Sequence, residues 1–256
     1  MNNIVFIPNV NLGNGRSDSY KYSIQSWKNW GEKNNVQVFE WTEPITDPSL
    51  MKITLQRYWV HDILQHNDIE YDQVLIVDAD TIIHPNSPNF FDITEGKFST
   101  VLNNGCYEWV TRSIKNWGEA LFEQDERPSP WEYFNGGFQI TSKEHIPFYD
   151  YVKDFYQTNA GTIKILADKI KAGTDQTVVN YLAKKFGVET KFLPEAYNLQ
   201  DLFRKNLLHI PGHSWFKDEL LFLDAGWVYH FNAIPQNPRH VDYWMERTYK
   251  QLYGEL

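Results

Sequence analysis

Short apolar runs alternate with helical patterns over residues 1–80 of this chain. The runs at residues 4–7, 36–41 and 74–77 have the length and composition of strands. Between them, apolar or small residues recur at three- and four-residue steps over residues 20–31 and 51–63, which predicts two helices. Strands that alternate with helices favour a parallel sheet with helices packed on its faces. This alternation is the feature that most limits the folds open to the chain.

Caps and helix breakers indicate where other elements begin and end. Asp47 and Pro48 suit the N-cap and the first position of a helix, so the second helix is expected to begin there. Thr174 and Gly187 are expected to cap and to end a later helix. Short strands are expected at residues 101–103, 138–141, 191–193 and 227–231, and a helix around residues 148–155. The expected fold class is α/β, with a Rossmann-like mixed central sheet flanked by helices, in a single domain over residues 1–256.

The bulk composition excludes several classes of function. A net charge of −9 and the lack of any Lys/Arg run argue against nucleic acid as a partner. The single cysteine, Cys106, excludes an internal disulfide framework and suits a reducing compartment. The stretch MNNIVFIPNV lacks the basic region of a signal peptide, and no window approaches the roughly 18 apolar residues that span a bilayer. A soluble, cytoplasmic protein without a transmembrane segment is therefore expected.

The stretch VLIVDADTII places two aspartates at the end of a buried strand. Asp78 and Asp80 project to the same side of an extended chain, and burial of both carboxylates is costly unless they have partners. Ligands in open α/β sheets bind at the carboxyl ends of strands, and paired carboxylates suit Mg²⁺ or Mn²⁺. His230, after another short apolar run, is a candidate third ligand. The alternative is that one aspartate caps a turn while the other faces solvent.

Two further segments carry polar residues that suit a ligand site. YFNGGFQIT is first of all a turn signal, but Gly136 and Gly137 also let the backbone approach a ligand closely. In the same segment, Asn135 offers both a donor and an acceptor to a hydroxyl. GTDQ places Asp175 and Gln176 in the first turn of a helix, where an aspartate is also favoured by the helix dipole alone. Each segment is informative only in combination with the others.

These segments, in this order, resemble the nucleotide-sugar-dependent glycosyltransferases of the GT-A fold, and among them family 8, the group of glycogenin and bacterial lipopolysaccharide galactosyltransferases. The matching segments are VLIVDADT, YFNGGF, GTDQTVVN and YHFN. The resemblance implies transfer of a sugar from a nucleotide sugar, with a UDP-sugar favoured, to a hydroxyl of a glycan or another acceptor. It also implies Mn²⁺ or Mg²⁺ as cofactor and retention of the anomeric configuration. Residues 1–95 would form a nucleotide-binding lobe and residues 96–256 an acceptor-side lobe.

The resemblance also implies roles for single residues. Asp78, Asp80 and His230 would bind the metal, and Asp78 would also contact the ribose. The residues that would act at the transferred sugar are Asn135, Asp175 and Gln176. The residues that would bind the donor, besides Asp78 and Asp80, are Pro8, Asn9, Arg57, Ala79, Gly136 and Gly137. Lys52 is a second candidate for the basic residue near the donor, and the aromatic stretches around Trp109, Trp131 and Trp215 suit either the core or the acceptor side.

The segment after His230 departs from the family pattern. The family has a glycine and then a lysine that grips the diphosphate, whereas this chain has Ala233 and Gln236 at those positions. Arg239 or His240 would have to replace the lysine. The departure leaves open inversion with a carboxylate base, and also a degenerate member that binds a nucleotide or glycan without turnover.

A second family shares part of the central motif. Haloacid-dehalogenase-like phosphatases carry an apolar strand followed by Asp-x-Asp-x-Thr, which DADT matches, and Asp78 would then be the phosphoryl-accepting nucleophile. Those proteins have the motif on their first strand and need a downstream acidic pair at a strand end. Here residues 1–73 precede the motif, and the nearest acidic candidate, GTDQ, begins a helix. A phosphatase is carried as the alternative enzymatic interpretation.

Overall fold

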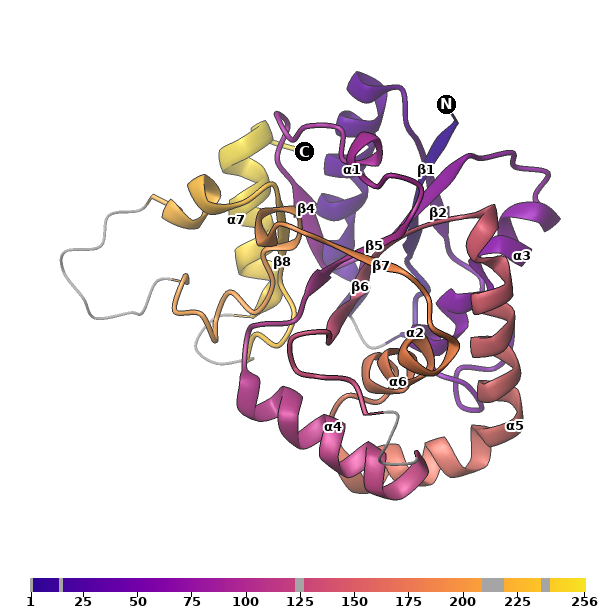
Figure 1. Cartoon of the computed structure of the whole chain (residues 1–256). Coiled ribbons are helices and arrows are strands. Elements are labelled where there is room, and N and C mark those ends of the chain that lie inside the picture. Colours follow the sequence, from indigo (N-terminus) through magenta and orange to yellow (C-terminus); the bar gives the residue numbers. More distant parts are fainter. Residues whose placement is uncertain (1, 14–15, 123–126, 209–218, 236–239) are drawn as a thin grey trace.

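The computed structural model describes residues 2–13, 16–122, 127–208, 219–235 and 240–256 (Figure 1). Its strands are β1 Asn3–Pro8, β2 Gln37–Trp41, β3 Gln73–Val77, β4 Thr81–Ile83, β5 Phe98–Leu102, β6 Phe134–Ser142, β7 Thr190–Leu193 and β8 Val228–His230. Its helices are α1 Tyr20–Asn34, α2 Ile53–Gln56, α3 Val60–His66, α4 Tyr107–Leu121, α5 Ile146–Ile170, α6 Gln176–Phe186 and α7 Val241–Tyr253. In the part of the chain that is described, no helix is both long and apolar enough to cross a membrane.

The central sheet has six strands in the order β2-β1-β3-β6-β5-β7. β1 pairs in parallel with β2 and β3, and β5 pairs in parallel with β7, while β6 runs antiparallel to both of its neighbours. The expected mixed α/β sheet is therefore confirmed. Because β6 is antiparallel, Phe138 lies opposite Val77 and the start of β6 lies beside the end of β3. The sheet thus brings the Asn-Gly-Gly segment next to the Asp-Ala-Asp segment.

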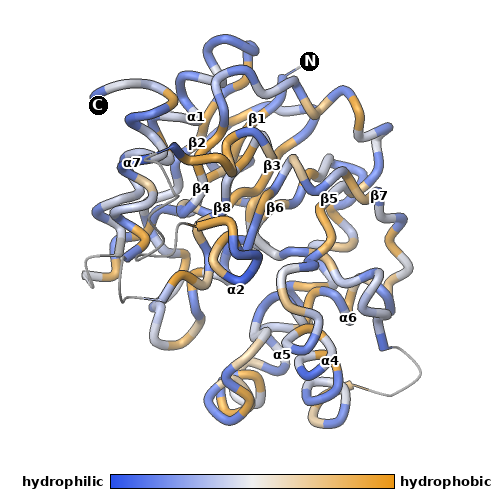
Figure 2. The backbone as a smooth tube through the Cα atoms, turned by 90° about the vertical axis from the view of Figure 1, so that its left-hand side faces the viewer, coloured by the Kyte–Doolittle hydropathy of each residue, from blue (hydrophilic) through white to orange (hydrophobic). Residues whose placement is uncertain are grey.

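Helices cover both faces of this sheet, and its apolar side chains alternate between two cores. Val5 and Leu75 pack in one cluster with Trp27 of α1. Ile76 points to the opposite face, in a cluster that includes Val152 of α5. Complete burial of such a side chain contributes about 1.5–3 kcal/mol relative to exposure. Figure 2 shows the resulting concentration of hydrophobic segments, in orange, along the strands.

The third candidate ligand, His230, lies in a separate two-stranded sheet formed by β4 and β8. The sequence led us to expect a strand over residues 227–231 in the central sheet, and this placement was wrong. β8 instead pairs antiparallel with β4, with Thr81 opposite His230. Since Asp80 directly precedes Thr81, this pairing brings His230 beside the aspartate pair.

The predicted start of the second helix was also wrong. Asp47 makes a local turn, in which its Oδ1 accepts a 2.8 Å hydrogen bond from Ser49 N, and the helix begins only at Ile53. The buried side chain of Gln56 accepts hydrogen bonds from Ile45 N and Thr46 N. These contacts hold the preceding residues as a loop, and a cap pattern in the sequence does not reveal them.

Two smaller expectations need correction for a similar reason. Asn135 and Gly136 lie inside β6, not in a turn, because pairing with β3 and β5 on both sides outweighs their local turn preference. α6 begins at Gln176 with Asp175 as its N-cap residue, so Thr174 is not the cap. The end of α6 is confirmed, since Gly187 adopts a left-handed conformation with φ of 76° directly after Phe186.

Candidate functional site

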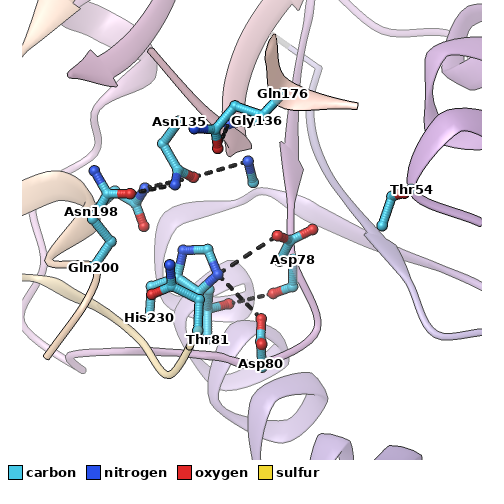
Figure 3. A network of polar contacts seen from close by, with 12 residues as sticks. Thr54, Asp78, Asp80, Thr81, Asn135, Gly136, Gln176, Asn198, Gln200 and His230 are labelled. Carbon is cyan, nitrogen blue, oxygen red and sulfur yellow. Dashed lines mark hydrogen bonds and ion pairs between the residues drawn. The ribbon is translucent and has the colours of Figure 1, made fainter. Parts of the chain in front are cut away.

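Asp78, Asp80 and His230 converge at the carboxyl end of β3 (Figure 3). His230 Nε2 lies 3.2 Å from Asp80 Oδ1 and 3.5 Å from Asp78 Oδ2. One ligand atom from each residue lies within 4.8 Å of the other two. Neither histidine nitrogen makes a hydrogen bond with a described residue, although both are buried. Two carboxylates and an imidazole that face one point form a donor set suited to a divalent cation.

The turn between β3 and β4 holds the two aspartates in place. Thr81 Oγ1 donates a 2.8 Å hydrogen bond to the backbone carbonyl of Asp78, and Trp27 Nε1 donates a 3.0 Å hydrogen bond to Thr81 Oγ1. The backbone carbonyl of Asp80 accepts a 2.8 Å hydrogen bond from Phe231 N. Ala79 is buried between the aspartates. The threonine of DADT is therefore a structural part of the site.

Gly137 lets the backbone of β6 approach this cluster. Asp78 N donates a 3.0 Å hydrogen bond to Gly137 O. A Cβ atom at Gly137 would lie 2.2 Å from Asp78 Oδ2 and 2.8 Å from His230 Cε1, so no larger residue fits unless the site shifts. At Gly136 the nearest contact of such an atom would be Gln176 Cβ at 3.4 Å. The two neighbouring glycines thus differ, and only Gly137 is required by the ligand cluster.

Arg57 contacts three segments of the site: the end of β3, the start of β6 and the start of α6. Its Nη1 donates to Asp78 Oδ1 at 2.6 Å and to Gly136 O at 3.0 Å, and its Nη2 lies 3.7 Å from Asp175 Oδ2. Burial alone would lower the pKa of Arg57, but the charges of Asp78 and Asp175 outweigh that effect and raise the pKa. Arg57 therefore stays cationic and pairs with two carboxylates at once. Lys52, the second basic candidate, is exposed at the N-cap of α2.

Asp175 and Gln176 reach the site from the start of α6. Gln176 Oε1 accepts a 2.9 Å hydrogen bond from Gly136 N, and its Nε2 is buried without a partner among the described residues. Burial raises the pKa of Asp175, and Arg57 offsets that rise only in part. For His230, burial would lower the pKa, but the charges of Asp80 and Asp78 raise it overall. The site thus holds a dense set of charges in a buried environment.

The side chain of Asn135 is hydrogen-bonded to two other amide side chains, which the sequence analysis did not identify. Its Nδ2 donates to Gln200 Oε1, and its Oδ1 accepts from Gly137 N at 2.9 Å and from Asn198 Nδ2 at 3.2 Å. Gln200 Nε2 donates in turn to Leu102 O at 2.8 Å. Figure 3 shows this amide cluster beside His230. The sequence feature that could have identified these two side chains is the polar segment YNLQD, which follows β7 at the same edge of the sheet.

The remaining donor-side candidates lie at the end of β1. Pro8 is the last residue of β1, and Asn9 N donates a 2.8 Å hydrogen bond to Trp41 O at the end of β2. Asn9 Nδ2 donates to Glu40 Oε1 at 2.7 Å, while Asn9 Oδ1 is buried without a partner among the described residues. Both residues therefore lie at the same edge of the sheet as Asp78.

The segment after His230 is described only in part. Ala233, at the position where the resembled family has glycine, adopts a left-handed backbone with φ of 55°. The backbone conformation that favours glycine is thus kept without a glycine. Other residues considered from the sequence lie outside the described residues, namely His209, His213, Trp215, Gln236 and Arg239.

No family model matches the chain, and no curated protein matches its sequence. Solved structures do resemble its fold. The chain is similar to a glycosyltransferase involved in the glycosylation of the major capsid of PBCV-1, with a TM-score of 0.59 and 10% identity over 96% of this chain and 99% of that one. Mouse xyloside xylosyltransferase 1 has a TM-score of 0.48 and 10% identity over 92% of this chain and 100% of that one.

The galactosyltransferase LgtC, solved with donor and acceptor sugar analogues, has a TM-score of 0.46 and 12% identity over 98% of this chain and 95% of that one. The fold is assigned from the similarity to the PBCV-1 enzyme, whose TM-score of 0.59 is higher than those of the other two structures. It agrees with the mixed sheet of six strands and with a ligand cluster at the carboxyl end of β3. The chain therefore has the GT-A fold of glycosyltransferases.

Proposed function

We propose that this protein is a metal-dependent glycosyltransferase. It moves a sugar from a nucleotide sugar, with UDP as the favoured nucleotide, to a hydroxyl of a glycan or another acceptor. The observation that carries the proposal is the convergence of Asp78, Asp80 and His230 in a fold that glycosyltransferases use. Residues 1–95 would hold the nucleotide and residues 96–256 the acceptor.

The ligand cluster fits Mn²⁺ or Mg²⁺ on chemical grounds. Two carboxylates offer the hard oxygen donors that these cations prefer, and Mn²⁺ also accepts an imidazole. His230 Nε2 faces both carboxylates at 3.2 and 3.5 Å without making a hydrogen bond to either, and a cation among the three groups would satisfy them together. When bound, a divalent cation supplies Lewis-acid stabilisation of the departing diphosphate. Arg57 keeps Asp78 oriented toward the cation and balances the negative charge of Asp175.

The side chain of Asn9 supports a base with an N–H donor. A carboxylate only accepts hydrogen bonds, so the contact with Glu40 identifies the atom bound there as the amide nitrogen of Asn9. The opposite atom, Oδ1, is therefore an acceptor, and it has no partner among the described residues. The N3–H of uracil would satisfy it, whereas cytosine presents an acceptor at the same position. This arrangement favours UDP over a cytidine nucleotide.

The start of α6 supports the binding of the transferred sugar. The contact with Gly136 N uses Gln176 Oε1, which leaves the amide nitrogen as a buried donor for a sugar hydroxyl. Asp175 is 21% exposed at its side chain and is paired with Arg57, so it offers a carboxylate oxygen of fixed position. Asn135 is 3% exposed, and both the nitrogen and the oxygen of its amide are hydrogen-bonded. We therefore assign Asn135 to the support of the site and Gln176 and Asp175 to contacts with the sugar.

The pairing of the carboxylates supports retention of the anomeric configuration. Inversion requires a carboxylate that is free to accept the proton of the acceptor hydroxyl. Among the described residues near the site, each carboxylate lies beside a basic side chain. Asp78 and Asp175 pair with Arg57 and Asp201 pairs with Arg204, while Asp80 lies beside His230 as a proposed ligand of the metal. NMR of the anomeric proton in the product tests this part of the proposal.

The phosphatase interpretation is not favoured. A nucleophilic Asp78 would need a carboxylate oxygen free to attack phosphorus, but Oδ1 pairs with Arg57 and Oδ2 lies close to His230. In addition, Asp175 begins a helix and does not follow a strand. The downstream acidic pair that such a phosphatase requires at a strand end therefore has no counterpart at this position.

Hydrolysis of sugar nucleotides without an acceptor tests the proposed function. The experiment compares UDP- and GDP-sugars with Mn²⁺, using wild type, Asp80→Asn and the exposed control Asp68→Asn. Wild type and the control should release one nucleotide in a metal-dependent way. Asp80→Asn should be slower by about 10²-fold or more, as expected for loss of a group that stabilises developing charge.

Binding of Mn²⁺, measured by electron paramagnetic resonance, separates the metal site from turnover. Unchanged Mn²⁺ affinity in Asp80→Asn would contradict the metal site. Tight nucleotide binding without hydrolysis of any donor would instead favour a non-catalytic binder. Hydrolysis of a simple phosphomonoester would favour a phosphatase.

A further inference from the structure

Aromatic rings are exposed around the start of α4. Trp131 has a relative exposure of 68% and Tyr107 one of 39%. Their ring centroids lie 5.1 Å apart with the planes tilted by 56°, so the two rings form one surface. Large aromatic side chains are mostly buried in folded proteins, and a group of exposed ones marks a binding surface.

A third aromatic ring, Trp109, has a guanidinium over its face. Arg204 Cζ lies 6.0 Å from the ring centroid of Trp109, and Arg204 Nη1 donates to Asp201 Oδ1 at 2.8 Å. The side chain of Asp201 is only 1% exposed, so the far end of this ion pair is fixed. A fixed guanidinium above an aromatic face offers several N–H donors next to an apolar plane.

Contacts on two sides connect this surface with the candidate site. On one side, the ring of Trp109 meets that of Tyr133 edge-on, and Tyr133 OH lies 2.7 Å from Thr177 Oγ1 in the first turn of α6. On the other side, Asp201 N donates a 2.7 Å hydrogen bond to Asn232 Oδ1, two residues after the histidine of the metal cluster. Trp109 therefore lies beside the edge where we propose that sugar transfer occurs, and Tyr107 lies two residues before it at the start of α4.

An unpaired amide oxygen lies at the same edge. Asn104 follows β5, and its Nδ2 donates to Glu195 Oε2 at 2.8 Å, which identifies its Oδ1 as an acceptor. Glu195 is also paired with Lys205, so the carboxylate that binds the amide of Asn104 is itself held in place. Asn104 Oδ1 is buried and has no partner among the described residues. A hydroxyl donor would satisfy this oxygen.

We infer that the aromatic surface of Tyr107, Trp109 and Trp131 binds the acceptor, and that the acceptor is a saccharide. A pyranose ring has an apolar C–H face that packs on an aromatic ring and hydroxyls at its edge that bond to fixed polar groups. The surface offers both, because Arg204 and the start of the nearby loop at Asn104 flank the rings. The inference rests on the proposed function, since it is the acceptor of a glycosyltransferase that must lie beside the donor.

Saturation-transfer NMR with methyl β-glucoside, methyl β-galactoside, lactose and cellobiose tests this inference without turnover. The variants are Trp131→Ala, Trp131→Phe and the control Phe186→Ala, which removes a 44% exposed ring at the far end of α6. Wild type and the control should bind at least one saccharide with equal affinity. Trp131→Ala should bind about tenfold more weakly, the equivalent of one lost aromatic contact, and Trp131→Phe should recover most of the affinity.

Two results would overturn the inference: no saccharide of the panel binds wild type, or wild type and Trp131→Ala bind with equal affinity. Transfer of the sugar to a peptide at an unchanged rate in Trp131→Ala would overturn it as well, in favour of a peptide acceptor. Donor hydrolysis is measured separately on the same variants and should be unchanged in the control Phe186→Ala. Saccharide binding that depends on Trp131, without hydrolysis of any donor by wild type, would support the surface and refute the enzymatic function.

Discussion

Arg57 and Asp78 form an ion pair in which the buried Nη1 lies 2.6 Å from Oδ1 of the partly exposed aspartate. The pair uses one oxygen of Asp78, while the other, Oδ2, lies 3.5 Å from His230 Nε2. Arg57 is 3% exposed and also contacts Gly136 O and Asp175. One side chain thus connects the strand that carries the aspartates with β6 and with the start of α6.

Replacement of Arg57 should destabilise the fold. Arg57→Met leaves the two carboxylates of Asp78 and Asp175 without their cation, and removal of one partner from a buried pair costs about 3–5 kcal/mol. Arg57→Lys keeps the charge but lacks the planar fork that reaches several acceptors, so its effect should be smaller. Urea unfolding measures the free energy of both variants. A free energy of unfolding for Arg57→Met equal to that of wild type would contradict the role of Arg57 as the shared partner.

The two adjacent glycines of β6 should respond differently to an added methyl group. Gly137→Ala places Cβ within 2.2 Å of Asp78 Oδ2, which should displace the carboxylate and weaken Mn²⁺ binding by about 10–100-fold, as for other changes that reorient a ligand. Gly136→Ala meets its nearest atom at 3.4 Å and is the matched control, with affinity near that of wild type. Isothermal titration calorimetry measures both affinities. Equal affinities for the two variants would show that the approach of Gly137 does not matter for the metal.

Gln200 should support the site through Asn135. Gln200→Met keeps the shape of the side chain but leaves Asn135 Nδ2 and Leu102 O without their present partners, at a cost of about 1–3 kcal/mol for each buried group. The loss should also lower kcat for donor hydrolysis more than it changes KM for the donor, because Asn135 is paired with Gly137 beside the proposed metal ligands. Gln25→Met, at an exposed position of α1, is the control and should change neither quantity. Wild-type stability and kcat in Gln200→Met would refute the supporting role.

Stability should fall at acidic pH, in part because of His61. Burial, together with the charge of Lys153, lowers the pKa of His61 to about 3, and its Nδ1 lies 2.5 Å from Tyr71 OH. The unfolded chain has a normal histidine pKa, so between that value and about 3 it binds a proton that the folded chain does not. Stability therefore rises with pH in this window, by up to about 1.4 kcal/mol per pH unit, and is lost as the pH falls.

Comparison with His61→Gln isolates this contribution. The variant should show a shallower decline between pH 6.5 and pH 4 than wild type, whereas the exposed control His66→Gln should follow wild type. Chemical unfolding at a series of pH values gives the free energies. Parallel curves for wild type and His61→Gln would mean that His61 does not stay neutral in the folded protein.

Local patterns in the sequence were enough to predict the main layers of the fold. The runs that became β1, β2 and β3 and the periodicity that became α1 depend on each residue being apolar at the right spacing. The position of Asp78 and Asp80 at a strand end follows from the same local pattern. These features could be predicted because a continuous aliphatic run favours burial by its own composition.

Other features depended on partners that are distant in the chain. The Asn-Gly turn expected near Gly136 became a strand because β3 and β5 supply hydrogen-bonding partners on both sides. The helix expected at Pro48 was replaced by a loop because the side chain of Gln56 binds the backbone on both sides of it, at Ile45 and Thr46 and at Met51. In both cases tertiary hydrogen bonds contributed more to stability than the local preference for a turn or a helix.

The sequence by itself determined which chemical groups this protein has for its site: two aspartates after a buried strand, a histidine after a later one, and an Asp-Gln pair at a helix start. Only the tertiary structure decided that they meet. The pairing of β4 with β8 brings His230 to Asp80, and Arg57 joins Asp78 to Asp175, which is distant in the chain. Gln200 was found only in the structure, and so were the exposure of Trp131 and its contact with Tyr107, since the sequence left open whether Trp131 belongs to the core. The physical reason is that a local pattern specifies burial and backbone conformation, whereas a site is made of contacts between segments that no local pattern relates.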